Sequence, residues 1–89
     1  MAKAESAFWD KETVVAQVTR SGHEQIVVKL VERRNRAYVD VRTWWTDPHD
    51  PNDKVLKPSP KGLTIPIEAA RDVAKAIERA AELDEESAR

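Results

Sequence analysis

The chain of 89 residues contains no cysteine, two glycines, and one residue each of phenylalanine, tyrosine and methionine. Without cysteine, the protein has no disulfide bond, no thiolate nucleophile and no cysteine-ligated zinc, and it tolerates a reducing compartment. No apolar run approaches the length of a membrane span, and no charged-then-apolar leader begins the chain. The sequence therefore predicts one small domain that makes no contact with a membrane.

Net charge is also nearly absent, because the formal value is -1. The total charge thus gives no indication of a polyanionic partner, but the charges are unevenly distributed along the chain. Acidic residues gather near the end, from Glu78 to Glu86. The middle of the chain carries the basic residues Arg33, Arg34, Arg36, Arg42, Lys57 and Lys61. We expect one basic and one acidic face.

The periodicity of the apolar residues predicts four strands followed by one helix, an α+β fold with an antiparallel order of strands. A turn signal at Ser21-Gly22 and a tight connection at residues 33–36, where Asn35 tolerates a positive φ, separate the first three strands. Pro66 is expected to begin the helix. The expected segments are a lead-in over 1–12, strands over 13–20, 25–32, 37–45 and 61–65, a helix over 67–83 and a solvated tail over 84–89. In the lead-in, Phe8 and Trp9 either anchor a frayed terminus, the preferred interpretation, or stay loose.

The third strand has two faces of different character. Val39, Val41 and Thr43 share the face that we expect to be core, and Trp45 joins them if the alternation holds. The opposite face mixes aromatic rings with charges, at Tyr38, Asp40, Arg42 and Trp44. The second strand is so apolar that we expect it to be covered on both faces. One helix leaves part of a four-stranded sheet uncovered, and in a chain this small the surplus surface predicts a ligand surface or a dimer interface.

Cations interleaved with aromatic rings indicate binding of a single nucleic-acid strand. The basic turn at residues 33–36 is followed by Arg42 and two tryptophans, and then by Lys57 and Lys61. Cations contact phosphates, while rings stack on unpaired bases with roughly 1–3 kcal/mol per base. The alternative for the basic turn is a solvated hairpin tip without a ligand. The alternative for Trp44 or Trp45 is a place in the core.

Metal and catalytic sites are not expected. Asp47, Asp50 and Asp53 alternate with proline and asparagine, but the spacing lacks the glycine and the final glutamate of a calcium loop, so we expect them to begin turns. His23 and His49 lie far apart in the sequence, and no nucleophile elbow or phosphate loop is present. The sequence predicts a protein that is not an enzyme and uses no cofactor.

Two motifs in order resemble the C-terminal domain of the transcriptional coactivator positive cofactor four (PC4) family. The first is the run from Tyr38 to Pro48, and the second is the run from Leu56 to Ile65 before the helix. The resemblance covers about Ile26 to Ile77. It implies a curved four-stranded sheet with one C-terminal helix, a homodimer, and sequence-tolerant binding of single-stranded DNA by the domain over 13–83.

The resemblance also implies which residues contact DNA. Arg42 matches an arginine that contacts DNA, and Trp45 matches a tryptophan that stacks on a base. Arg33 replaces a stacking phenylalanine of the eukaryotic members, and Pro60 stands where a basic residue is common. The full expected set is Arg20, Arg33, Arg34, Arg36, Arg42, Trp45, Lys57 and Lys61.

The long regulatory segment of the eukaryotic coactivators is absent from this sequence, so the chain is similar to the compact prokaryotic and viral members. We expect a cytoplasmic, nucleoid-associated homodimer that binds single-stranded DNA in transcription regulation, replication or repair. The alternatives are single-stranded RNA binding and a protein-interaction adaptor for a polymerase or a repair enzyme.

Overall fold

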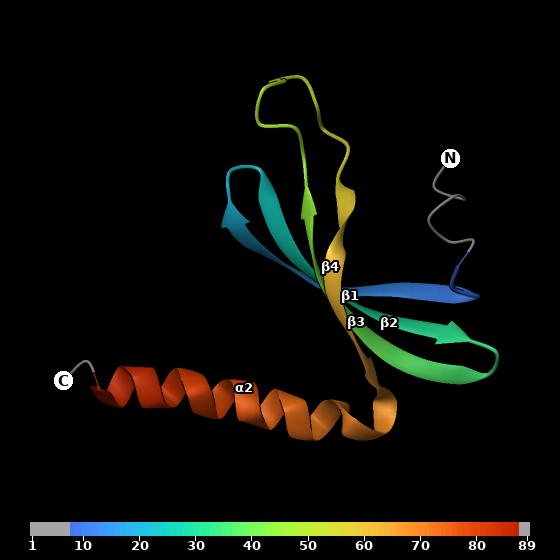
Figure 1. Cartoon of the computed structure of the whole chain (residues 1–89), viewed down its shortest axis with the longest axis vertical. Coiled ribbons are helices and arrows are strands. Elements are labelled where there is room, and N and C mark those ends of the chain that lie inside the picture. Colours follow the sequence, from blue (N-terminus) through green and yellow to red (C-terminus); the bar gives the residue numbers. More distant parts are fainter. Residues whose placement is uncertain (1–7, 88–89) are drawn as a thin grey trace.

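The computed structural model of the protein describes residues 8–87. The elements follow one another as β1 (Lys11–Ser21), β2 (Glu24–Arg33), β3 (Arg36–Trp45), β4 (Lys57–Pro66) and α2 (Ile67–Ser87). The strands form one antiparallel sheet in the order β1-β2-β3-β4, so each strand pairs with its neighbour in sequence. Figure 1 shows this strongly twisted sheet followed by α2. The predicted α+β fold is confirmed.

Several boundaries differ from those predicted. β1 begins at Lys11, inside the expected lead-in, and α2 continues through most of the expected tail. β4 begins four residues earlier than predicted, because Pro58 and Pro60 are tolerated on an edge strand, where no ladder N–H is required. Pro66 is the last residue of β4 and precedes the helix. Residues 1–7 of the lead-in and 88–89 of the tail lie outside the described residues.

The β2–β3 hairpin closes through a tight two-residue turn. Arg34 and Asn35 have φ values of 53° and 65°. A positive φ at both central residues is the mark of a type I′ turn, whose twist matches that of the flanking strands. The prediction for Asn35 is confirmed. Arg34 adopts the same conformation, and its side chain is exposed at the tip of the hairpin.

The sheet has an apolar face and a mixed face. β2 and β3 pair without a register shift, so alternate residues define the two sides. The apolar face carries Val18, Ile26, Val28, Leu30, Val39, Val41, Trp45, Leu63 and Ile65. The mixed face carries Val27, Lys29, Val31, Tyr38, Asp40, Arg42, Trp44 and Thr64.

The prediction that the valine face of β3 forms the core holds only in part for the single chain. Val27, Val31 and Asp40, all on the mixed face, are at most 3% exposed. On the apolar face Ile65 is 7% exposed and Val39 and Val41 are half-buried, whereas Leu30 and Leu63 are 39% and 55% exposed. The sheet is curved so that all four strands line one cavity on the mixed face, which Trp9 also covers. β2 is therefore covered mainly on one face, and the apolar face remains largely open.

The helix covers little of the sheet. α2 has its main contacts with β3 and β4, and none of its residues is buried. Ile77 is 63% exposed, and Figure 1 shows α2 extending well beyond the strands. The Cα radius of gyration is 15.3 Å, compared with about 12 Å for a compact domain of this length. Within residues 8–87 no helix combines the length and apolarity that a membrane crossing needs.

Candidate nucleic-acid interface

The predicted contact residues form separate groups along β3 instead of one cluster. Arg33, Arg34 and Arg36 lie at the β2–β3 hairpin, where β3 begins. Trp45 and Lys57 lie where β3 ends, and Arg42 lies between the two groups. β3 has ten residues, so its ends are up to roughly 30 Å apart at about 3.3 Å per residue.

Trp45 and Lys57 form an open pair of ring and cation. They face each other across β3 and β4, and Lys57 Nζ lies 4.8 Å from the centroid of the Trp45 ring. Trp45 is 37% exposed and lies on the apolar face, as the alternation predicted. Lys57 Nζ also donates to Asp53 Oδ2 at 2.6 Å. An exposed indole beside a fixed ammonium group is suited to stacking on a base.

Asp53 organises the loop that places Lys57. Its carboxylate accepts hydrogen bonds from the backbone N–H groups of Asp47 at 2.7 Å and Val55 at 3.1 Å. The hydrogen bond from Lys57, followed by those from the backbone, lowers the pKa of Asp53 to about 2. Asp47 and Asp50 likewise accept backbone N–H groups two residues ahead, which confirms that the loop aspartates begin turns.

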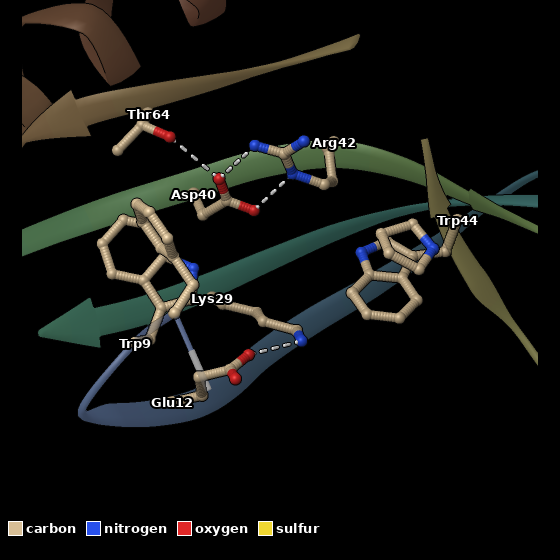
Figure 2. Close-up of a pocket in the computed structure, with 9 residues that line it drawn as sticks. Trp9, Glu12, Lys29, Asp40, Arg42, Trp44 and Thr64 are labelled. Carbon is tan, nitrogen blue, oxygen red and sulfur yellow. Dashed lines mark hydrogen bonds and ion pairs between the residues drawn. The ribbon is translucent and has the colours of Figure 1, made fainter. Parts of the chain in front are cut away.

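Arg42 is held by a carboxylate and by the backbone of β4. Its Nε and Nη2 donate to the two carboxylate oxygens of Asp40, each at 2.8 Å, and its Nη1 donates to the Ser59 carbonyl at 2.9 Å. The hydroxyl of Thr64 donates to Asp40 Oδ1 at 3.0 Å, as Figure 2 shows. Burial would raise the pKa of Asp40, but the hydrogen bonds from Arg42 and Thr64 and the nearby positive charges hold it below its usual range. The hydrogen bond to Asp40 in turn raises the pKa of Arg42.

Gly62 provides the space that the Arg42 side chain occupies. The two residues are cross-strand partners, and a Cβ at position 62 would lie 2.6 Å from Arg42 Cζ. Arg42 therefore crosses over β4 on the mixed face, whereas Trp45 lies on the apolar face. Three of the five N–H groups of the guanidinium are engaged, so two remain for a further ligand.

The cavity on the mixed face has a volume of about 470 Å³ and holds a second ion pair, which is partly buried. Lys29 Nζ donates to Glu12 Oε1 at 2.9 Å and lies 4.2 Å from the centroid of the Trp44 ring (Figure 2). Trp44 is half-buried and closes one side of the cavity. Lys29 is thus occupied by a carboxylate and a ring inside the fold.

The other predicted cations are at the surface. Arg20 Nη1 lies 2.9 Å from Glu24 Oε1, which neutralises it in part. Lys61, Arg34 and Arg36 are exposed, and their side chains form no ion pair among residues 8–87. These three cations are the ones most available to a polyanion.

Two known crystal structures share this architecture. The PC4 homologue BPSL1147 of Burkholderia pseudomallei superimposes with a TM-score of 0.69 and 27% sequence identity, over 80% of this chain and 98% of that one. A second crystal form of the same homologue gives a TM-score of 0.68 and 26% identity, over 82% and 93% of the two chains. The resemblance to the PC4 family is confirmed. No protein-family model matches the sequence, and no curated protein sequence gives a significant match. The resemblance to the PC4 family therefore rests on shared architecture together with the two motifs.

Within this PC4-like fold, two residues matter that sequence reasoning did not include in the site. Asp40 holds Arg42, and the signal for it was its place two residues before Arg42 on the same face of the strand. Phe8 lies over the Arg33 guanidinium, with its ring centroid 3.9 Å from Cζ. Its sequence signal was only an aromatic pair near the beginning of the chain, which does not say what the rings contact.

Proposed function

We propose that this PC4-like protein binds single-stranded DNA as a homodimer, with little dependence on base sequence and without catalysis. The process would be transcription regulation, replication or repair, close to the nucleoid in the cytoplasm. The observation that carries the proposal is the exposed Trp45 ring beside Lys57 at one end of β3, whose other end adjoins the hairpin turn with Arg33, Arg34 and Arg36. Rings stack on unpaired bases and cations contact phosphates, so the surface along β3 suits an unpaired nucleic-acid strand.

The separation of the two basic ends supports a dimer. One chain spreads its contact residues along β3 and leaves the apolar face of the sheet largely open. The apolar stripe of α2 contains no buried residue and is formed by Ile67, Ala70, Val73, Ala74, Ile77, Ala80 and Ala81. Exposed apolar surface of this extent is typical of an association surface. Pairing two copies through α2 and the part of the apolar face away from Trp45 would bury apolar residues and leave the Trp45 ring open. It would place four contact groups on one molecule, two from each copy.

Arg34, Arg36 and Lys61 are the proposed phosphate contacts, together with Lys57 and, more weakly, Arg20. Arg33 is proposed to contact DNA through the plane of its guanidinium. For Arg42 we propose a smaller share, because Asp40 already neutralises much of its charge. Its main contribution is to hold β3 against the bulged part of β4, between Pro58 and Gly62. The two tryptophans also differ: Trp45 is the proposed stacking ring, and Trp44 is a wall of the cavity.

A competition assay tests the proposal. A labelled single strand of about twenty nucleotides, chosen against roughly 4–16 nucleotides per binding fold, is bound and then challenged with matched duplex DNA or RNA at two salt concentrations. We expect duplex to compete poorly, and the logarithm of the affinity to fall with the logarithm of salt by about 0.7 for each phosphate contact. Equal competition by RNA would extend the function to RNA. Equal competition by duplex, or indifference to salt, would favour the protein-interaction adaptor instead.

A further inference from the structure

Phe8 is the most exposed aromatic side chain among residues 8–87, at 54%. Its ring stands at 88° to the Trp9 ring, with centroids 4.7 Å apart, and Trp9 in turn lies 5.8 Å from the Tyr38 ring on the sheet. Trp9 is half-buried and therefore anchors this segment. Phe8 is not required as an anchor, and most of its surface faces solvent.

The segment that carries Phe8 is fixed to the β2–β3 hairpin. The backbone N–H of Asp10 donates to the Glu32 carbonyl at 2.8 Å, and the backbone N–H of Arg34 donates to Asp10 Oδ2 at 2.8 Å. The Arg33 guanidinium lies over the Phe8 ring at 3.9 Å. The ring is therefore held in place before any ligand arrives, which lowers the ordering cost of binding.

Positive charge surrounds this ring. Arg33, Arg34 and Arg36 lie within one tight turn, and the exposed side chains of Arg34 and Arg36 form no ion pair among the described residues. The nearby carboxylate of Asp10 accepts the Arg34 backbone N–H. A planar ring, a planar guanidinium and flanking cations together match a base and its neighbouring phosphates, since both planar groups stack on bases.

We propose that Phe8 and the Arg33 guanidinium form a binding site for one unpaired nucleobase, with Arg34 and Arg36 contacting the adjacent phosphates. This site deepens the function proposed above and rests on it. It lies at the opposite end of β3 from Trp45, so each chain carries two stacking positions. Arg33 lies on the mixed face by the register and Trp45 on the apolar face, so a DNA strand contacts both only if it passes from one face of the sheet to the other along β3.

Three substitutions separate stacking from packing. Phe8→Leu keeps an apolar side chain against Trp9 but removes the flat ring, so we expect a folded protein that binds single-stranded DNA about 5- to 150-fold more weakly, with the salt slope unchanged. Phe8→Trp keeps a stacking ring and should bind at least as tightly as wild type. Val15→Ala, at an exposed position of β1 outside both contact groups, is the matched control and should bind like wild type.

Photo-crosslinking gives a second and direct readout. A single strand with 5-iododeoxyuridine at successive positions is irradiated in complex with the protein, which is then digested with trypsin. Cleavage after Lys3 and Lys11 releases residues 4–11, which contain Phe8. We expect a crosslink in this peptide that fragment sequencing assigns to Phe8 and that Phe8→Leu removes.

The outcomes distinguish this site from the general function. Wild-type protein that does not bind single-stranded DNA would overturn both proposals. If wild type binds and Trp45→Ala weakens it, while Phe8→Leu binds like wild type and residues 4–11 carry no crosslink, only the Phe8 site is wrong. A flattened salt slope in Phe8→Leu would also contradict base stacking, because loss of a neutral ring removes no phosphate contact.

Discussion

At the scale of single residues, the role of each cation depends on what already holds it. Arg42 matches the DNA-contacting arginine of the resemblance, yet its guanidinium is bonded to Asp40 and to the β4 backbone. Arg34 and Lys61 are exposed and form no ion pair within residues 8–87. An exposed cation can exchange water for phosphate at little cost, whereas a buried pair must be broken first. Position in a motif alone does not reveal this difference.

Trp45→Ala should weaken single-strand binding by about 1–3 kcal/mol, because one stacked base loses its platform. The salt slope should stay close to the wild-type value, since Lys57 and the arginines remain. Fluorescence anisotropy at two salt concentrations measures both quantities. The ring is 37% exposed, so the variant should stay folded. If no soluble Trp45→Ala protein can be obtained, Trp45 is a core residue instead.

Gly62→Ala should destabilise the fold by about 1–3 kcal/mol, the usual range for overpacking. The new Cβ would meet Arg42 Cβ and Cζ at 2.7 and 2.6 Å, so the guanidinium must leave its place beside Asp40. Gly22→Ala is the matched control, because nothing lies within 4 Å of the added atom. Urea unfolding at one protein concentration compares the two. Equal urea midpoints for Gly62→Ala and Gly22→Ala would show that Arg42 can cross β4 by another path when position 62 carries a Cβ.

At the scale of the elements, the two-residue period and the turn residues were sufficient to predict four strands and a helix. They did not show that β4 begins before Pro58, because proline usually opposes strand structure and only the position at the edge permits it. They also did not show which face of β3 is buried. That depends on sheet curvature and on Trp9, which folds back from the lead-in onto Tyr38. Contacts between distant segments, such as Phe8 with Arg33, have no local signal at all.

Asp53→Asn should lower the stability of the fold at neutral pH and make that stability less sensitive to a fall in pH. The folded pKa of Asp53 is about 2, below its ordinary value of 3.8. A depressed pKa gives stability that is present above the unfolded value and is lost as pH falls towards the folded one. The difference from wild type should therefore be full near neutral pH and should shrink between about pH 4 and pH 2.

Urea midpoints at several pH values measure this difference. Asp40 is common to both proteins, so its own titration cancels in the comparison. Asn52→Ala, in the same loop and uncharged at every pH, is the control and should differ from wild type by a constant amount. A difference for Asp53→Asn that stays constant down to about pH 2 would mean that its carboxylate does not hold the loop together.

At the scale of the whole molecule, the sequence predicted that one chain buries too little apolar surface, but it did not predict which surface stays exposed. The short chain and its one amphipathic helix indicated that association would be needed. The structure shows the deficit as an open apolar face beside a helix without a single buried residue. The two proposed stacking positions lie at opposite ends of β3, so in the proposed dimer a second copy would add contact groups as well as stability.

Ile77→Glu should therefore weaken dimerisation and DNA binding together. Ile77 lies on the apolar stripe of α2 and is 63% exposed in one chain. If the stripe is buried in a dimer, each of the two copies loses roughly 1.5–3 kcal/mol of burial and gains a charge to desolvate. Sedimentation at micromolar concentration should show wild type as a dimer and the variant as a monomer or partly unfolded chain. Lys75→Glu, on the polar side of the same helix, is the control and should remain dimeric.

DNA length then tests whether the two copies act on one strand. A strand of about twenty nucleotides that contacts both subunits gains from effective concentration, whereas a strand of roughly six nucleotides contacts one group only. We expect folded Ile77→Glu monomer to match wild type on the short strand and to lose the additional affinity on the long one. A wild-type protein that sediments as a well-folded monomer, or a variant that keeps the full gain with length, would place all the necessary contacts within a single chain.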